Sequence, residues 1–246
     1  MAFDVVFPGK YVCSSSGNGA DQDGCRKDEA DFMVSAKRQG FSLIVFAYHY
    51  HDRTTFQNIC ADASSRISKL EISSTISYKF AAILSKRNFN DVQSLKEKGY
   101  LTFFDAAEDF LGKRFERDDM DKYLRMIASS KHVDGLFGIE RVSTKKGLHY
   151  RNGGMSHINA KMMQENNIFL LEDWNALLPA NSKKANLPGI LQNAKLSRKY
   201  SFPMSFFSFA GDPSGMSSAE NMKSVSRQFG IPTKWQSETT LFPKLS

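Results

Sequence analysis

Apolar residues occupy both alternating faces of one short segment, residues 41–52, which reads FSLIVFAYHYHD. At a period of two, the side chains of a strand here would divide into two sets: Phe41, Leu43, Val45 and Ala47 on one side, and Ile44, Phe46, Tyr48 and Tyr50 on the other. A strand that is apolar on both faces is covered on both sides. We therefore expect this segment inside a sheet, with other elements packed on each face.

The first half of the chain also contains helical patterns. A short helix is expected over residues 30–38. Ser74 can cap another helix, whose apolar stripe at i, i+4, i+7 and i+8 consists of Ile76, Phe80, Ile83 and Leu84. Residues 91–99 fit a short helix that ends at its glycine, and residues 100–104 fit a strand.

The clearest helix starts at Asp118 or Asp119 and carries Met120, Tyr123, Leu124, Ile127 and Ala128 on one face. Residues 136–154 fit a hairpin, because apolar and polar positions alternate before a Lys-Lys-Gly turn. A helix in 155–167, a strand in 168–174 and a long loop over 175–201 are predicted to follow.

The C-terminal third predicts a strand, a turn and a helix in succession. The strand lies within residues 201–211 and the turn within 212–216. Ser217 and Glu220 form a capping box for the helix, whose apolar stripe consists of Ala219, Met222, Val225 and Phe229. Gly230 and Pro232 then end it.

Both periodicities occur throughout, which favours an α+β protein: a sheet-centred, β-sandwich-like core flanked by helices. With 246 residues, 41% of them hydrophobic, the chain can bury one substantial core. We predict a single compact domain over residues 1–246, in which residues 1–40 are a candidate N-terminal arm or extension.

The net charge of +7 favours anionic partners, although 26 acidic residues are mixed among 33 basic ones. One stretch, Trp174 to Gly211, contains no acidic residue. Its basic residues, near several aromatic side chains, are candidate contacts for an anion, a nucleotide or RNA: Lys183, Lys184, Lys195, Arg198 and Lys199. A basic loop beside a buried strand, or a surface for an acidic patch of another copy, explains the same stretch.

The N-terminus lacks the basic start and sustained apolar stretch of a signal peptide, and no run of 18 apolar residues occurs, so a cytosolic protein is expected. The three cysteines, Cys13, Cys25 and Cys60, form no CxxC pair. Their spacing indicates reduced thiols rather than a disulfide framework or a zinc knuckle.

Catalytic motifs are not found. His49 and His51 have a spacing that aims two imidazoles to one side of a strand, but a third metal ligand is not evident. Neither a GxSxG nucleophile elbow nor a complete phosphate-binding glycine loop occurs. The carboxylates between Asp105 and Asp119 are explained by helix caps and salt bridges. We predict no catalytic residues, no metal, no cofactor and no enzymatic role.

Residues 41–52 and 201–230 resemble the cypovirus polyhedrins, the proteins of the crystalline occlusion bodies of insect reoviruses. The likeness rests on the paired aromatics after the apolar strand Leu43–Ala47, on the later strand Ser205–Gly211 and on the helix that follows it. That helix is marked by Ser218, Ala219, Asn221, Met222 and Val225, with Trp235 beyond.

This resemblance implies a structural protein whose homotrimers pack into a lattice around virions, in the cytoplasm of the infected cell. Nucleotides, which some members of the family carry, are implied as candidate ligands. The lattice would dissolve at alkaline pH, where tyrosine and lysine, with pKa values of about 10 and 10.4, lose their protons. Tyr48 and Tyr50 are candidates for this alkaline release or for packing alone.

The alternative is a viral RNA-binding nucleoprotein with a basic groove, favoured by the charge and by the stretch without acidic residues. RNA affinity that falls steeply with salt would support it. Crystals in the cytoplasm of expressing cells would instead support the polyhedrin.

Overall fold

The computed structural model describes residues 2–8, 29–71, 75–110, 117–142, 155–177 and 187–236. In this part of the chain, seven strands form one sheet in the order of the sequence: β1 (Phe3–Val6), β2 (Leu43–His49), β3 (Ser77–Leu84), β4 (Leu101–Asp105), β5 (Gly135–Phe137), β6 (Phe169–Asp173) and β7 (Met204–Phe207). All neighbouring strands pair in parallel, from Phe3 opposite Leu43 to Asp173 opposite Phe207.

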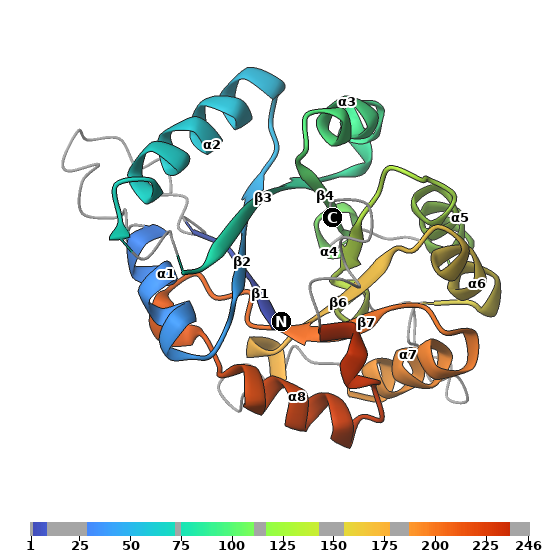
Figure 1. Cartoon of the computed structure of the whole chain (residues 1–246). Helices are drawn as coiled ribbons and strands as arrows, with labels where there is room; N and C mark the ends of the chain where they lie inside the picture. Colours follow the sequence, from blue (N-terminus) through green and yellow to red (C-terminus); the bar gives the residue numbers. More distant parts are fainter. Residues whose placement is uncertain are drawn as a thin grey trace, which may run out of the picture.

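Helices connect the strands and form a ring around them (Figure 1). Their bounds are α1 (Glu29–Arg38), α2 (Arg53–Ile67), α3 (Val92–Glu97), α4 (Ala106–Phe110), α5 (Arg117–Ala128), α6 (His157–Glu165), α7 (Leu187–Tyr200) and α8 (Ala219–Gln228). Short 3₁₀ turns are η3 (Lys86–Asp91), η4 (Ile139–Arg141), η5 (Asn175–Leu177), η7 (Pro213–Gly215) and η8 (Thr233–Gln236). No helix of the described residues is long and apolar enough to cross a membrane.

The sheet closes on itself between β1 and the residues that follow β7. Val6 forms a parallel bridge with Ala210. The Phe209 amide donates to the Val5 carbonyl at 2.9 Å, and the Phe7 amide donates to the Ala210 carbonyl at 2.9 Å. The architecture is therefore a parallel β/α barrel, and the predicted β-sandwich-like α+β core is wrong. Each helical connection returns the chain to the same end of the sheet, which makes every pairing parallel.

A buried carboxylate reinforces this closure. Asp4 on β1 is 0% exposed. Its Oδ1 accepts from the Ser208 amide and the Val5 amide, each at 2.8 Å, and its Oδ2 accepts from the Ser208 hydroxyl. Burial raises the pKa of Asp4 to about 7, although these hydrogen bonds act in the opposite direction.

The barrel interior is filled by side chains that point inward from every strand. Ring contacts link the N-terminal and C-terminal strands: the Phe3 and Phe207 rings lie 5.0 Å apart, and the Phe7 and Phe209 rings 4.8 Å. Smaller residues balance these rings. A Cβ added to Gly135 would lie 2.6 Å from Leu171 Cδ1, so a larger residue at this position of β5 would displace the Leu171 side chain.

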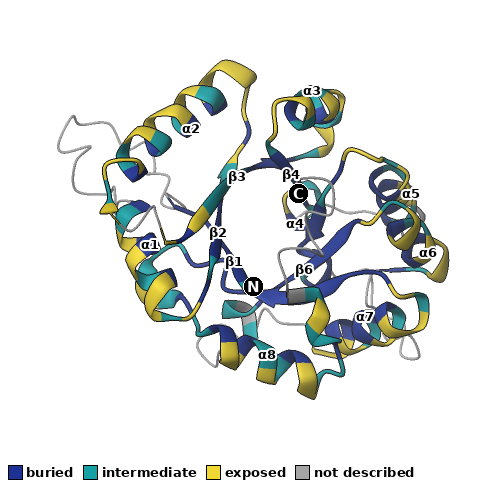
Figure 2. Ribbon diagram, in the orientation of Figure 1, coloured by how far each residue is buried: buried dark blue, intermediate teal, exposed yellow. Residues whose placement is uncertain are grey.

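The outer face of the sheet packs against the buried sides of the helices, whose opposite sides face solvent (Figure 2). β2 shows both environments. Val45 points into the barrel, whereas Phe46 packs against Phe32 of α1, with ring centroids 6.4 Å apart. The prediction of a strand covered on both faces is confirmed.

Other local predictions are confirmed as well. They concern the helices α1, α3, α5 and α6 and the strands β4, β6 and β7. The last helix, α8, also forms, but Ser218 rather than Ser217 is its N-cap and accepts from the Asn221 amide. Gly230 ends that segment with a φ of 71°.

Three local predictions are wrong. The helix expected after Ser74 is strand β3, because side chains on both of its faces are buried in the sheet and under the helices. The expected hairpin is not formed, since Leu136 pairs in parallel with β4 and β6; its later residues, 143–154, lie outside the described residues. The loop expected over 175–201 contains α7. In the candidate arm, residues 3–6 are β1 and residues 29–38 are α1.

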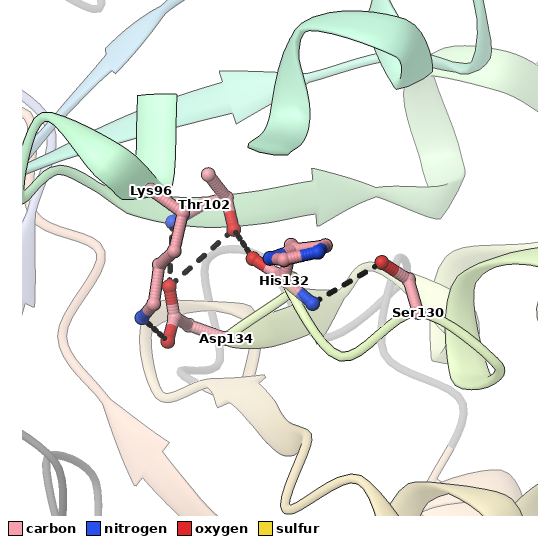
Figure 3. Close-up of polar contacts among 5 residues, drawn as sticks. All are labelled: Lys96, Thr102, Ser130, His132 and Asp134. Carbon is pink, nitrogen blue, oxygen red and sulfur yellow. Dashed lines mark hydrogen bonds and ion pairs between the residues drawn. The ribbon is translucent and has the colours of Figure 1, made fainter. Parts of the chain in front are cut away.

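A polar network joins the ends of β4 and β5 that lie opposite the carboxyl ends of the strands (Figure 3). Asp134 accepts from the Thr102 amide at 3.0 Å and pairs with Lys96 of α3. The Thr102 hydroxyl donates to the His132 carbonyl at 2.6 Å. At this end of a barrel such contacts serve stability, so His132 has a structural role through its backbone.

The buried Asp4 predicts how stability depends on pH. An unfolded aspartate has a pKa of about 3.9. Because the folded pKa is higher, the folded state holds the Asp4 proton more tightly. The contribution of Asp4 is fully present below the unfolded pKa and is lost as the pH rises toward about 7.

Asp4→Asn keeps the size and one acceptor oxygen but removes this titration. We expect its unfolding free energy, relative to the wild type, to improve by about 2 kcal/mol between pH 5 and pH 8. Urea denaturation at several pH values measures it. Asp62→Asn, at an exposed site on α2, is the matched control. Parallel pH curves for Asp4→Asn and the wild type would contradict the assignment.

Candidate functional site

The carboxyl ends of the strands form the mouth of the barrel, where the active sites of β/α barrels lie. Side chains alternate along each strand, so the inward series Val45, Ala47 continues to His49, and Phe103 is followed by Asp105. On β6, Leu171 is followed in the same way by Asp173. The mouth therefore carries polar residues from β2, β4 and β6.

Aromatic rings close the other side of this mouth. Phe7, Phe137 and Phe209 are all buried, with ring centroids 5.8 Å apart for Phe7 and Phe137 and 5.0 Å for Phe137 and Phe209. In the described residues, the polar part of the mouth is thus confined to the side of β2, β4, β6 and η4.

Arg141, at the end of η4, organises the carboxylates of the mouth. Its Nη2 lies 2.5 Å from Asp173 Oδ2, and its Nε lies 3.3 Å from Glu140 Oε1. Burial lowers the pKa of the Arg141 guanidinium, but Glu140, Asp173 and Asp105 outweigh this effect and raise it. The guanidinium therefore stays charged and serves as a common counterion.

Asp105 is held by a backbone hydrogen bond as well as by the charge of Arg141. Its Oδ1 accepts from the Ala107 amide at 2.8 Å. A Cβ on Gly138 would lie 2.5 Å from that same oxygen, and Gly138 has a φ of 77°, so glycine is required there. Burial raises the pKa of Asp105, and Arg141 opposes the shift.

His49 lies at the exposed rim. Its Nδ1 is 3.6 Å from Glu108 Oε2, and both side chains are about half exposed. His49 and His51, which have the spacing of a metal-binding pair, lack a third ligand: within the described residues, no group of three or more His, Cys, Asp or Glu is placed to hold a metal. Of the other carboxylates in the 105–119 cluster, Asp109 accepts from the Lys86 amide at 2.8 Å.

The basic candidates are partly on one helix. Lys195, Arg198 and Lys199 are exposed on α7, and Lys199 lies over the Tyr200 ring at 5.3 Å. None of these three takes part in an ion pair among the described residues. Lys183 and Lys184 lie outside the described residues.

The tyrosine candidates point away from the mouth. The Tyr48 hydroxyl donates to Glu29 Oε1 at 2.8 Å, and Arg66 of α2 binds the same carboxylate. Burial and the Glu29 charge raise the pKa of Tyr48. Tyr50 is buried against Phe56, with ring centroids 5.8 Å apart. Tyr48 thus ionises at a higher pH than an exposed tyrosine would.

Sequence reasoning did not single out Arg141, Glu140 or Asp173 as a group. Glu140 and Arg141 are adjacent, but Asp173 lies 32 residues further along the chain, and the parallel pairing of β5 and β6 brings it to them. The sequence nevertheless carries a signal for this group, because each of these three residues lies at the end of a buried strand or shortly after it. In a parallel sheet, such positions share one edge.

No protein-family model and no curated protein sequence matches this chain. A chain of an archaeal ribonuclease P, solved with mature tRNA, has a TM-score of 0.61 and 14% identity, over 98% of this chain and 87% of that chain. Histidinol phosphate phosphatase from Lactococcus lactis, complexed with zinc, L-histidinol and phosphate, has a TM-score of 0.56 and 7% identity, over 94% of each chain. Helicobacter pylori aminofutalosine deaminase has a TM-score of 0.47 and 12% identity, over 89% of this chain and 61% of that chain.

The first two of these likenesses, with TM-scores above 0.5, agree with the barrel fold, and this fold overturns the resemblance to polyhedrins. The segments that suggested it are β2 and the β7–α8 unit, parts that are common in parallel α/β proteins. The expected functions, an occlusion-body protein or a viral nucleoprotein, are wrong. The expectation of no enzymatic role is likewise contradicted by these two matches, one to a chain of an enzyme and one to an enzyme.

The polar residues of the mouth can be compared with the ligands that a catalytic zinc site requires. Asp173 is paired with Arg141, Asp105 accepts from a backbone amide, and His49 contacts Glu108. Aromatic rings fill the remaining side. The described residues therefore do not fit a zinc site of the catalytic type, which needs about three convergent protein ligands.

The role of Arg141 can be tested by Arg141→Met, which keeps the length of the stem and removes the charge. Three carboxylates would lose their counterion, and we expect a loss of about 3 kcal/mol in unfolding free energy at pH 7.5. The loss should shrink at pH 5, where the buried carboxylates can take up protons.

The matched control is Arg125→Met on α5, whose exposed ion pair with Asp121 is worth less than about 0.5 kcal/mol. Urea denaturation of both variants gives the comparison. Equal losses in the two would show that Arg141 does not organise the mouth.

Proposed function

We propose that this chain is a protein subunit of a ribonuclease P-like ribonucleoprotein enzyme, in which the barrel contributes an RNA-binding surface. The observation that carries the proposal is the end-to-end match of the fold, 98% of this chain, with a chain of a ribonuclease that holds tRNA.

The charge distribution supports the same function. The net charge is +7, and the segment from Trp174 to Gly211 has no acidic residue. The described part of that segment places Lys195, Arg198 and Lys199 on the exposed side of α7. Lysine and arginine on one helical face neutralise successive phosphates, and bound RNA then releases counterions.

The test is RNA binding by the triple variant Lys195→Gln, Arg198→Gln, Lys199→Gln. With a tRNA transcript as the probe, we expect a loss of affinity of at least about tenfold at 100 mM salt. The salt dependence, as the slope of log K against log salt, should fall by about 2 to 3, since each phosphate contact contributes about 1.

The matched control removes the same charge from α1 and from the turn after α2 by Lys37→Gln, Arg38→Gln and Lys69→Gln, at exposed positions. These helices lie on another side of the ring from α7 (Figure 1). An equal loss in both variants would show that only net charge matters. The absence of RNA binding by the wild type, together with no ribonuclease activity in its purified native assembly, would refute the proposal.

A phosphoester hydrolase is the second candidate, favoured by the His49, Glu108 and Asp105 side chains at the mouth and by the phosphatase match over 94% of both chains. It predicts turnover of p-nitrophenyl phosphate. The turnover should fall at least about tenfold in His49→Ala, as expected for loss of an acid–base group, and remain in His157→Ala, at an exposed position at the start of α6. No turnover above buffer would eliminate this candidate.

A further inference from the structure

A buried polar cluster lies outside the barrel, between the sheet and α7. Glu172 follows the inward-facing Leu171 on β6, so it points toward the helices, and it is 0% exposed. Asn193 of α7 is also 0% exposed, and its Nδ2 donates to Glu172 Oε1 at 3.4 Å. Glu140 of η4, which packs on α7, is 3% exposed. Three elements thus meet at two carboxylates and one amide.

Three oxygen atoms of this cluster have neither a hydrogen-bond partner nor an ion-pair contact: Glu140 Oε2, Glu172 Oε2 and Asn193 Oδ1. A fourth, Glu140 Oε1, has no hydrogen bond, and its contact is the ion pair with Arg141 Nε at 3.3 Å. Buried polar atoms are almost always satisfied, and a buried acceptor without a donor destabilises the folded state. All four atoms are acceptors when the carboxylates are ionised. A donor or a cation would satisfy them together.

The charges of the neighbouring side chains also favour a bound cation. Glu140 and Glu172, with Asp105 and Asp173 at the mouth, give four carboxylates around Arg141. Arg141 is already in contact with Asp173 at 2.5 Å and with Glu140 at 3.3 Å. The guanidinium cannot balance the other carboxylates, and buried charge without a partner is strongly unfavourable.

We propose that Glu140, Glu172 and Asn193 bind a hard divalent cation, with Ca²⁺ as the preferred ion. The donors are all oxygens, which favours Ca²⁺, Mg²⁺ or Mn²⁺ over softer metals. Both Glu140 oxygens are without a hydrogen bond, and Ca²⁺ accepts bidentate carboxylates in irregular geometry, whereas Mg²⁺ keeps several waters.

The site differs from a cluster of metal-ligating side chains of the usual kind, because one of its three residues is an amide. This agrees with the finding that no three His, Cys, Asp or Glu of the described residues are placed for a metal. A bound cation would join η4, β6 and α7. It would thereby fix the orientation of α7, which carries Lys195, Arg198 and Lys199.

A shared proton is the competing explanation. Burial raises the pKa of Glu140 to about 7 and raises that of Glu172 well above its usual range. A protonated carboxyl could donate within the pair and would need no metal. The two explanations differ at pH 8, where a proton is released more readily and a cation is bound more tightly.

The experiment uses the full chain at pH 8 after removal of metals with a chelator. Equilibrium dialysis with Ca²⁺ should give one bound ion per chain. The thermal midpoint should rise by about 5 °C at a hundredfold excess of Ca²⁺ over its dissociation constant. The rise with Mg²⁺ should be smaller, and K⁺ should have no effect.

Glu172→Gln and Asn193→Ala should abolish both the stoichiometric binding and the rise. Glu165→Gln, an exposed residue of α6 that lies 3.8 Å from Lys161, is the matched control and should retain both. If Glu172→Gln does not fold, the dialysis of the wild type and of Asn193→Ala decides.

No Ca²⁺ bound by the wild type at pH 8 would overturn the proposal. So would Ca²⁺ binding that persists unchanged in Asn193→Ala and Glu172→Gln, because the ion would then sit elsewhere. No RNA is used in these measurements, so their outcome does not depend on whether the chain is a ribonucleoprotein subunit.

Discussion

Closure of the sheet between β1 and the residues after β7 is the constraint on which the other features depend. In an open sheet, one face could bury its phenylalanines only under a second layer. In the barrel, these side chains bury each other: Phe3 of β1 contacts Phe169 of β6 and Phe207 of β7. The closure has few main-chain hydrogen bonds, and Asp4 adds two bonds to Ser208 across it. A short strand therefore holds the barrel closed through a buried carboxylate.

The number of strands limits what the interior can contain. Barrel diameter grows with the number of strands, so a barrel of the seven described strands is narrower than the common one of eight. Large rings on β1, β4, β6 and β7 fit because β2, β3 and β5 contribute Ala47, Ala81 and Gly135. The interior has little room left for polar groups. These are displaced to the rim and to the space beneath the helices, where Arg141 and the carboxylates lie.

Much of the local structure could be predicted from the sequence, because strong periodic patterns and caps agree with the fold. The failures have specific causes. The segment of β3 contains Ala81 and Ala82, and its larger apolar residues also fit a helical stripe, so the pattern alone could not decide. The start of α7 contains Pro188 and Gly189, the two residue types with the lowest helix propensity. Proline is in fact tolerated in the first turn of a helix, where its missing amide has no partner to lose.

The segment of α2 carries both an N-cap and an apolar stripe, the two local marks of a helix. Asp52 accepts from the Thr55 amide at 2.9 Å as its N-cap, and the apolar stripe is Phe56, Cys60, Ala63 and Ile67. A helix between two strands that are apolar on both faces would have indicated parallel strands rather than a sandwich. The order of the strands is a long-range property, however. The site followed from that order, so its residues could not be grouped from local patterns.

The division between the inside and the outside of the barrel bears on function. Inside the described mouth, the ionisable groups have partners: Asp173 has Arg141, Asp105 has a backbone amide, and His49 has Glu108. On the outer face of α7, the basic groups are exposed. Groups that already have partners must lose them before they can bind a ligand, whereas exposed cations exchange only water and counterions for phosphate. A surface role within a larger RNA-containing enzyme therefore requires less rearrangement of this barrel than a new active site at its mouth.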